Sequence, residues 1–325
     1  MSTFATVLST GRYLPERRIA NEDLTQFPKM SLPLIAAKTG VQARRHADDA
    51  DCTSDLALRA SRVCLQKCGF APALLEGIIL STSSPDRPQP ATATRVQALL
   101  GATSAFALDV NAVCSGGIYA LHLADSLIRS GRHKYILVIG AEIYSRILNP
   151  RDFSTYPYFG DGAGAILLGP SAEPGLIYTE LGADGAGAEL IRVPAGGSMM
   201  PPNKLSKPED IYFKMSGREV FEFAVSKGSE ILRAALTKCD LRAEQIRWFV
   251  SHQANINILN ELADRLEVPR EAFAVTLKEY GNTASASILI TLDELIDNGQ
   301  VERGDLIAIA AFGGGLAWGA GILRY

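Results

Sequence analysis

Phe106-Ala-Leu-Asp-Val-Asn-Ala-Val-Cys-Ser-Gly-Gly and Phe273-Ala-Val-Thr-Leu-Lys-Glu-Tyr-Gly-Asn-Thr-Ala-Ser are two copies of one pattern. In each copy, an apolar run typical of a buried strand passes into a helix-like run that opens with small residues. The first copy carries a cysteine at this junction and the second carries an asparagine. The chain therefore repeats a strand-to-helix junction and places a different chemical group at each one.

The spacing within the copies aligns them. Gly131 follows Cys114 by 17 positions, and Gly299 follows Asn282 by 17. Asn282 thus stands at the register of Cys114. Because repetition on this scale is the signature of a duplicated fold, we expect two related halves.

The duplication continues upstream of both copies. The apolar run 77–82 matches the run 246–252 once a one-residue gap is allowed. Thr82 and His252 then occupy corresponding strand ends. His252 becomes a third polar residue at a repeated position.

The length of the chain agrees with a duplication. At 325 residues it exceeds the size of a usual single core. We expect an N-terminal half, 1–170, that carries the cysteine, and a C-terminal half, 171–325, that carries the histidine and the asparagine. A hydrophobic content of 47% and a charged content of 21% are ordinary for a globular protein.

Charge and cysteine usage limit the possible partners. A formal net charge of −3 gives no general attraction to nucleic acid or to an anionic membrane. No run approaches the roughly 18 apolar residues of a membrane span, and the N-terminus does not read as a leader peptide. The five cysteines fit no familiar disulfide spacing, and the four histidines lie far apart. We expect a cytoplasmic protein with no nucleic-acid partner, no membrane span and no metal site.

The periodicity of apolar residues predicts an alternation of strands and helices. The expected strands are 77–84, 106–113, 135–141, 165–168, 246–251, 272–277 and 306–312. The expected helices are 55–68, 92–100, 115–130, 216–239, 256–266 and 284–298. This order predicts parallel strands joined by crossover helices. The Gly/Pro-rich segment 177–208 is expected to form loops that cap the second half.

The helices that follow Cys114 and Asn282 are apolar on nearly every face. A helix of that kind is buried between layers. We expect an α/β fold in which two sheets enclose two central helices.

Cys114, His252 and Asn282 are the candidate catalytic residues. Taken singly, such residues are ordinarily core packing, a satisfied histidine and a helix cap. Related halves, however, bring their repeated junctions together at a central interface, which indicates a joint function. The first turn of a helix favours thiolate over thiol, so we expect a lowered pKa for Cys114 and an oxyanion site beside it.

Five motifs together resemble β-ketoacyl-acyl-carrier-protein synthase III, a condensing enzyme of the thiolase superfamily. They are Val113-Cys-Ser-Gly-Gly, Gly160-Asp-Gly-Ala-Gly-Ala, Ser251-His-Gln-Ala-Asn, Tyr280-Gly-Asn-Thr-Ala-Ser-Ala-Ser and Ala311-Phe-Gly-Gly-Gly-Leu-Ala-Trp-Gly. The resemblance covers essentially the whole chain. It implies a thiolase-like, five-layered αβαβα fold, a homodimer and an active site at the base of a pantetheine-sized tunnel. The glycines at 160–165 precede a strand, which is the wrong context for a nucleotide-binding loop, so we assign them to structure.

The resemblance also implies the reaction, a decarboxylative Claisen condensation in fatty-acid initiation or a related pathway of lipid metabolism. Cys114 would take an acyl group from an acyl-CoA primer. His252 and Asn282 would stabilise the enolate formed from malonyl-acyl carrier protein or malonyl-CoA. The amides of Cys114 and Gly314 would form the oxyanion hole. Coenzyme A and phosphopantetheine thioesters would be substrates, with no permanently bound cofactor.

The substrate contacts that the resemblance implies are further residues along the chain. Phe312 would disfavour the extender carboxylate, and the other positions are Lys38, Met215, Gly217 and Asn255. Gln89 stands about where a partner-subunit phenylalanine closes the acyl pocket in the family.

The tunnel mouth departs from the family pattern. Leu34 and Phe153 replace the tryptophan and arginine that sandwich adenine, so aromatic–guanidinium stacking is lost. Lys38 stands where a second arginine is usual in the family. It keeps the positive charge but cannot bind a phosphate through two parallel hydrogen bonds, as the guanidinium of an arginine can. Asn257 stands where the family often has an arginine that meets the carrier protein, which weakens electrostatic steering.

Other functions remain open on this scaffold. An acyltransferase that moves an acyl group to a hydroxyl or amine needs only Cys114 and His252, and Asn282 argues against it. A non-enzymatic structural partner would be expected to lose Cys114. Thiolase-type or hydroxymethylglutaryl-type chemistry would need a second cysteine or a glutamate base, and neither stands at a recognisable position.

Overall fold

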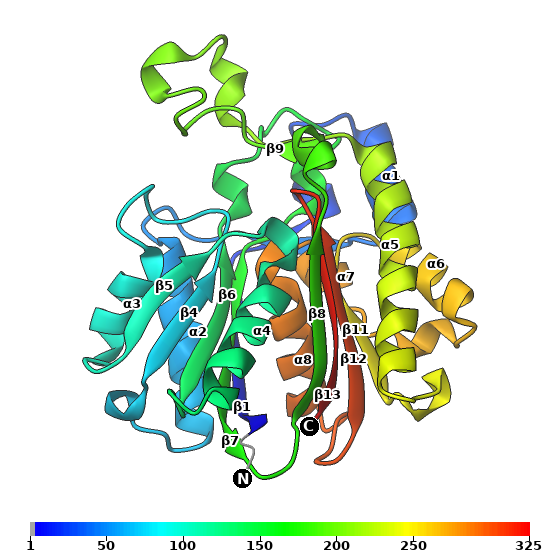
Figure 1. Cartoon of the computed structure of the whole chain (residues 1–325). Coiled ribbons are helices and arrows are strands. Elements are labelled where there is room, and N and C mark those ends of the chain that lie inside the picture. The colour runs from blue at the N-terminus through cyan, green and yellow to red at the C-terminus, as the bar shows by residue number, and fades with distance from the viewer. Residues whose placement is uncertain (1–3) are drawn as a thin grey trace.

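Two β-sheets and three layers of helices alternate through the molecule (Figure 1). The computed structural model describes residues 4–325. From the outer face of the first sheet to that of the second, the helices are α2 (Thr53–Lys67) with α3 (Thr92–Leu100), α4 (Gly116–Arg129) with α8 (Ser287–Asp297), and α5 (Gly217–Lys238) with α6 (Ile256–Leu266). The predicted five-layered αβαβα arrangement is confirmed.

The first sheet has the strand order β1-β7-β6-β4-β5. Its strands are β1 (Phe4–Tyr13), β4 (Gly77–Ser81), β5 (Phe106–Val110), β6 (Ile136–Glu142) and β7 (Gly162–Ser171). β4 pairs in parallel with β5 and β6, as the crossover helices α3 and α4 require. β7 and β1 then add antiparallel, so the prediction of parallel strands is right only for the β4, β5 and β6 part of this sheet.

The second sheet repeats this arrangement in the order β11-β12-β13-β8. Its strands are β8 (Leu176–Ala183), β11 (Trp248–Ser251), β12 (Leu306–Gly313) and β13 (Ala317–Arg324). β11 and β12 are parallel, as β4 and β6 are, and β13 and β8 add antiparallel, as β7 and β1 do. The chain passes from one sheet to the other between Ser171 and Leu176.

The predicted strand 272–277 is wrong. Only Phe273 forms an isolated parallel bridge, with Phe249 of β11. Beyond it, the side chain of Gln253 takes the backbone hydrogen bonds that a longer ladder would have supplied. Its Nε2 donates to the Ala274 carbonyl at 3.0 Å, and its Oε1 accepts from the Thr276 amide at 2.8 Å. A side-chain amide thus replaces the fifth strand.

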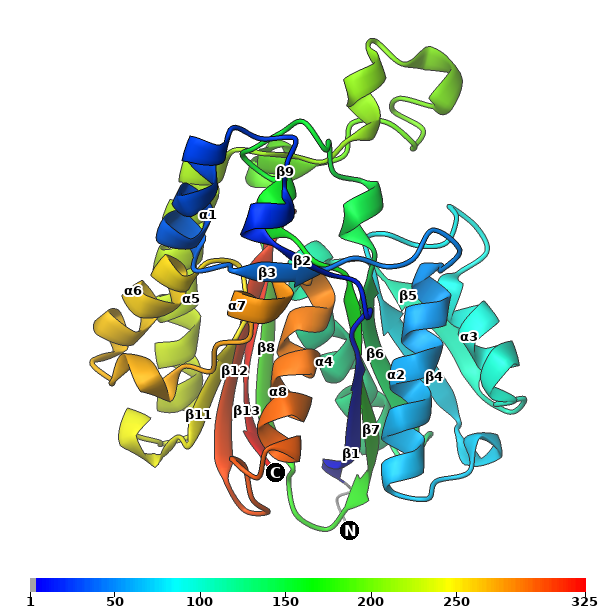
Figure 2. The same cartoon turned by 180° about the vertical axis from the view of Figure 1, so that it is seen from behind.

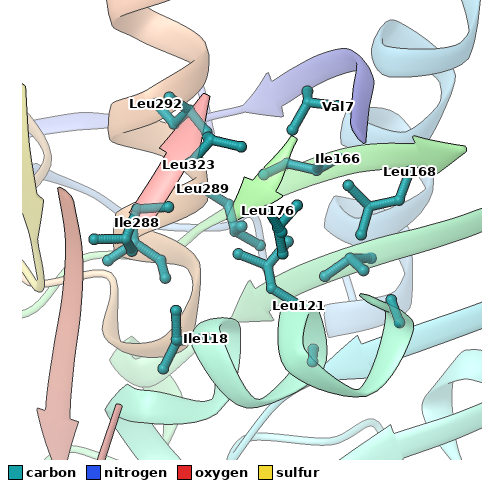
Figure 3. Close-up of a cluster of buried hydrophobic side chains, with 14 of the residues drawn as sticks. Val7, Ile118, Leu121, Ile166, Leu168, Leu176, Ile288, Leu289, Leu292 and Leu323 are labelled. Carbon is teal, nitrogen blue, oxygen red and sulfur yellow. The ribbon is translucent and has the colours of Figure 1, made fainter. Parts of the chain in front are cut away.

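The central helices meet in a dry core between the sheets (Figure 3). Ile118 and Leu121 of α4 pack with Ile288 and Leu289 of α8, and all four are at most 2% exposed. Strands β1, β7, β8 and β13 cover this core from both sides. The prediction that both helices are buried is confirmed for α8, whereas α4 leaves one face exposed, at Leu123, Ser126 and Arg129.

Both central helices begin immediately after a short turn that opens with a positive φ. Val113 and Ala284 each have a φ of 46°, and each starts a 3-10 turn that leads into α4 or α8. This backbone match makes Ser285, not Asn282, the counterpart of Cys114. The alignment from Gly131 and Gly299 differs because α4 has 14 residues and α8 has 11.

The segment after β8 is only partly as predicted. Residues 177–183 belong to β8 rather than to a loop. The chain then projects from the body of the molecule through short turns and the small strands β9 (Ile191–Arg192) and β10 (Lys214–Met215) (Figure 2). The remaining short elements near this end are α1 (Leu32–Thr39), α7 (Leu277–Tyr280), β2 (Arg18–Ala20) and β3 (Ala43–Arg45).

Candidate active site

Cys114 lies in the turn before α4 and is 6% exposed. The end of β12 packs directly on it. A Cβ on Gly313 would lie 2.8 Å from the Cys114 Cβ, so only glycine permits this approach. The glycine run after Phe312 therefore fixes the backbone of β12 against the thiol-bearing residue.

His252 follows β11 and is buried beside the same end of β12. Its amide donates to the Ala310 carbonyl at 2.8 Å, and its ring meets the ring of Phe312 edge-on with centroids 5.8 Å apart. The Nδ1 atom lies 2.8 Å from Ser287 Oγ, at the start of α8. Since Ser287 occupies Nδ1, the Nε2 atom is the one left for a substrate or for the thiol.

Asn282 is held by its backbone between the two halves. Its amide donates to the Tyr158 carbonyl at 2.8 Å, and its carbonyl accepts from the Gly160 amide at 3.0 Å. The side-chain Oδ1 accepts from the Ala284 amide at 2.8 Å. Because Oδ1 is engaged, the Nδ2 group is oriented as a hydrogen-bond donor.

Three sets of contacts bring these residues to one place. Cys114 shares a buried apolar cluster with Ala284, two residues after Asn282. His252 is bonded to Ser287, five positions after Asn282. Consecutive residues of β12 contact His252, through Phe312, and Cys114, through Gly313. Cys114 and His252 thus both contact the end of β12, and the segment that carries Asn282 reaches each of them through Ala284 and Ser287.

The electrostatics of the thiol differ from the sequence-based expectation. Burial, and after it the carboxylate of Glu142, raise the pKa of Cys114 above its ordinary value of 9.0. Burial lowers the pKa of His252 to about 3. At neutral pH the pair is therefore a thiol with a neutral imidazole, and the thiol proton must leave as the sulfur attacks.

Glu142 is a buried carboxylate that the sequence analysis missed. It lies at the end of β6 and accepts hydrogen bonds from Ser84 Oγ at 2.5 Å and from Ser285 Oγ at 2.7 Å. It also accepts from the amide and hydroxyl of Ser83 at 3.1 Å. Because Ser285 belongs to the turn before α8, Glu142 links the end of β6 and the segment 82–84 to that turn. The only signal in the sequence was the run of small polar residues at 82–84.

Gly314 lies against the turn that carries Cys114. A Cβ on Gly314 would lie 3.2 Å from Val113, the residue before Cys114. Among residues 4–325, neither the Gly314 amide nor the Cys114 amide donates a hydrogen bond to a protein acceptor. Two such free donors can bind an oxyanion.

The remaining predicted contacts differ in how they are placed and buried. Met215 packs on the apolar cluster that contains Cys114, whereas Gly217 is exposed at the start of α5. Asn255 caps α6 by accepting from the Asn257 amide. Lys38 is exposed on α1, and its carbonyl accepts from Asn257 Nδ2 at 2.7 Å. Lys38 and Asn255 are therefore both connected to Asn257, where α1 meets the start of α6.

Gln89 and the predicted tunnel mouth lie further out. Gln89 is exposed on its loop. Leu34 is 44% exposed, and Phe153 packs edge-on against Phe27 at 5.2 Å. This part of the surface is apolar where the family would offer an aromatic–arginine pair.

The glycine run at 160–165 has the structural role predicted for it. A Cβ on Gly160 would lie 2.0 Å from the Tyr280 carbonyl oxygen, and one on Gly164 would lie 2.6 Å from Leu289 Cβ. Asp161 is buried and accepts from the Ser145 amide and hydroxyl. These residues permit close packing against α8.

Acidification is expected to destabilise the folded protein. Burial lowers the pKa of His46 to about 4 and of His252 to about 3, from an ordinary value of 6.5. Between pH 6.5 and 4, these two histidines are protonated in the unfolded chain but stay neutral in the folded chain. Each histidine then removes roughly 1.4 kcal/mol of unfolding free energy per pH unit. Asp161 acts in the opposite sense below pH 6, because burial raises its pKa to about 6.

Urea unfolding at pH 7 and pH 5 measures this loss. The variant His46→Gln is expected to show less than half the dependence of wild type on pH, since one of the two histidine contributions is gone and the opposing contribution of Asp161 remains. Equal stability of wild type at the two pH values would contradict the assignment.

Residues 4–325 also limit other kinds of site. They contain no helix both long and apolar enough to cross a membrane. They contain no group of three or more His, Cys, Asp or Glu side chains arranged to hold a metal ion.

Comparison with known proteins agrees with this geometry. The family model described as 3-oxoacyl-[acyl-carrier-protein (ACP)] synthase III matches residues 108–185, and the model of its C-terminal part matches residues 236–325. The β-ketoacyl-[acyl-carrier-protein] synthase III of Natranaerobius thermophilus is 41% identical over 99% of each chain. Synthase III 3 of Streptomyces coelicolor is 43% identical over 99% of this chain and 98% of its own.

Solved structures give the same result. The synthase III of Aquifex aeolicus superposes with a TM-score of 0.91 at 39% identity and covers 99% of this chain and all of its own. The priming β-ketosynthase of the R1128 polyketide pathway superposes with a TM-score of 0.92 at 30% identity, covering 99% of this chain and 96% of its own. The protein therefore belongs to the β-ketoacyl-[acyl-carrier-protein] synthase III family, the thiolase-fold transferases that act as condensing enzymes.

Proposed function

We propose that the chain condenses an acyl primer carried on Cys114 with a malonyl thioester. The observation that supports this proposal is that Cys114 shares a cluster with Ala284 and His252 is bonded to Ser287, both within five residues of Asn282, whose Oδ1 is engaged by the Ala284 amide. A thiol alone would serve simple acyl transfer. An enolate requires, in addition, a pair of uncharged hydrogen-bond donors, which His252 and Asn282 would supply.

The first half-reaction is acylation of the thiol. The Cys114 sulfur forms a bond to the primer carbonyl, while His252 Nε2 accepts the thiol proton and passes it to the leaving thiolate. The free amides of Cys114 and Gly314 would stabilise the tetrahedral oxyanion. Since the pKa of Cys114 is raised, this proton transfer is part of the attack rather than a prior ionisation.

The second half-reaction breaks one carbon–carbon bond and forms another. The malonyl carboxylate leaves as carbon dioxide, and its electron pair becomes an enolate held by His252 Nε2 and Asn282 Nδ2. The enolate carbon attacks the acyl carbon, and the bond to Cys114 breaks. The departing thiolate takes up one proton. Phe312, packed against the histidine ring, supplies an apolar wall that favours loss of the carboxylate.

Ser287 supports both roles of His252, because a hydroxyl can either donate or accept. It can accept from Nδ1–H while Nε2 accepts the thiol proton, and it can donate to Nδ1 while Nε2–H binds the enolate. Ser287→Ala is therefore expected to slow both half-reactions about tenfold with little change in KM. Ser61→Ala removes a buried hydroxyl that is bonded only to a helix carbonyl in α2, and it should leave kcat unchanged. Equal kcat values in Ser287→Ala and wild type would contradict this positioning role.

The substrates and assembly complete the proposal. Acyl-CoA would deliver the primer, and malonyl-acyl carrier protein or malonyl-CoA would deliver the extender. The homodimer is supported by the edge position of β5, where Leu108 is 37% exposed. The cytoplasmic location stays a prediction from the sequence.

One experiment tests the reaction. Purified protein is incubated with acetyl-CoA, and intact mass is used to detect the acyl group on the protein. Malonyl-CoA or malonyl-acyl carrier protein is then added. Discharge of the acyl group, with release of carbon dioxide and formation of a 3-oxoacyl thioester, is the expected result. Transfer of the acyl group to a hydroxyl or amine acceptor without carbon dioxide would overturn the proposal.

A further inference from the structure

Arg44 carries a fully buried positive charge that is bound by amide oxygens. It lies in β3 and is 0% exposed. Within residues 4–325 its guanidinium donates three hydrogen bonds, and the acceptors are the Ile19 carbonyl at 3.1 Å, Asn21 Oδ1 at 2.5 Å and the Pro157 carbonyl at 2.7 Å. Burial lowers the pKa of Arg44 to about 10, so the group stays charged at neutral pH. Because a buried charge is costly, these hydrogen bonds must offset the loss of water around it.

The Pro157 carbonyl belongs to the segment that holds Asn282. One residue later, the Tyr158 carbonyl accepts from the Asn282 amide at 2.8 Å, and the Gly160 amide donates to the Asn282 carbonyl at 3.0 Å. Phe159, between these two residues, forms an isolated parallel bridge with Asn282. The guanidinium therefore holds the chain immediately before the two hydrogen bonds that fix the backbone of Asn282.

The stem of Arg44 packs against both sides of this small ladder. A Cβ on Gly160 would lie 3.3 Å from the Arg44 Cβ, and one on Gly281 would lie 3.2 Å from it. β3 also lies beside α7, the short helix that ends just before Gly281 (Figure 2). One side chain thus contacts the segment before Asn282 and the segment that is hydrogen-bonded to it.

We propose that Arg44 is a positioning residue for the second half-reaction, because it holds the backbone of Asn282 so that Nδ2 meets the enolate. This inference rests on the proposed role of Asn282 in condensation. A guanidinium presents its donors in one rigid plane, which fixes several carbonyls relative to one another. Without it, the segment 157–160 loses a fixed point next to Tyr158, and the carboxamide of Asn282 is displaced. Acylation does not use that carboxamide, so only discharge of the acyl-enzyme should depend on Arg44.

Arg44→Met tests this dependence, because it keeps an apolar stem against the two glycines and removes the guanidinium. Acylation of Cys114 by acetyl-CoA, measured by intact mass, should stay within about twofold of wild type. Single-turnover discharge by malonyl-CoA should slow roughly 10- to 100-fold, because a displacement of about 1 Å can cost about 10²-fold in rate. Arg44→Lys keeps the charge but replaces the planar group by a compact ammonium, so it should slow discharge less than Arg44→Met does.

Arg303→Met is the matched control. Arg303 also donates to two backbone carbonyls, those of Val7 and Leu8 in β1, which are not part of the ladder that holds Asn282. Its replacement should leave both half-reactions unchanged. Circular dichroism and thermal unfolding show whether each variant folds, and Arg44→Lys decides the matter if Arg44→Met does not.

A double variant separates positioning from a general loss of structure. If Arg44 acts through Asn282, adding Arg44→Met to Asn282→Ala should slow discharge by less than about twofold more, since the carboxamide to be positioned is already gone. Full additivity of the two substitutions would refute the inference. So would equal slowing of both half-reactions, or normal discharge in the folded Arg44 variants.

The same measurements distinguish this inference from the proposed reaction. Slow discharge in Asn282→Ala together with normal discharge in Arg44→Met would remove the inference alone. A wild-type protein that releases no carbon dioxide from malonyl-CoA or malonyl-acyl carrier protein would remove the condensation, and the role of Arg44 would fall with it.

Discussion

Cys114→Ala is expected to abolish the acyl-enzyme and to lower the rate of condensation by on the order of 10⁴-fold or more. The covalent intermediate needs a sulfur at the end of β12, where Gly313 packs directly on Cys114. The buried Cys64 cannot substitute for it, because it is a residue of α2 and lies in a separate core cluster from Cys114. Intact mass after incubation with acetyl-CoA measures the acyl group directly.

The variant should keep one partial activity. His252 and Asn282 are untouched by the substitution, so malonyl thioester should still lose carbon dioxide slowly and yield the acetyl thioester. Cys68→Ala removes an exposed thiol and serves as the matched control, with normal acylation expected. An acyl group retained by Cys114→Ala would show that another residue is the nucleophile.

The sequence predicted the layers of the fold better than the edges of its sheets. The helices α4 and α8 were predicted because apolar residues on every face have one physical explanation, burial between layers. The antiparallel strands β1, β8 and β13 were missed, because only strands that alternate with crossover helices were expected. The strand expected at 272–277 failed because Gln253, distant in sequence, satisfies the same backbone groups.

For the site, the sequence proposed the reactive groups but not their supports. Cys114, His252 and Asn282 were proposed from repeated junctions, although the backbone counterpart of Cys114 is Ser285. Glu142 was missed because its partners come from separate segments, and no local pattern marks a buried carboxylate. The expectation of a lowered pKa for Cys114 was wrong for the same reason. A helix start favours the thiolate, but burial and a neighbouring carboxylate oppose it more strongly.

Asn282→Ala is expected to separate the two half-reactions. Acylation should stay within about twofold of wild type, because Cys114, His252 and the two free amides remain. Condensation should slow by roughly 10²- to 10³-fold, the usual cost of one donor to a developing oxyanion. The donor in question is Nδ2, which the Ala284 amide orients by engaging Oδ1. Single-turnover discharge of the acyl-enzyme by malonyl-CoA measures the second step alone.

Asn298→Ala is the matched control, because it removes an exposed carboxamide of the same size from the residue that follows α8. It should leave the rate of discharge unchanged. Asn282→Asp should be slower than Asn282→Ala, since a carboxylate replaces a donor with a negative charge beside the enolate. If Asn282→Ala discharged at the normal rate, enolate stabilisation would fall to His252 alone, and the duplicated junction would be structural rather than catalytic.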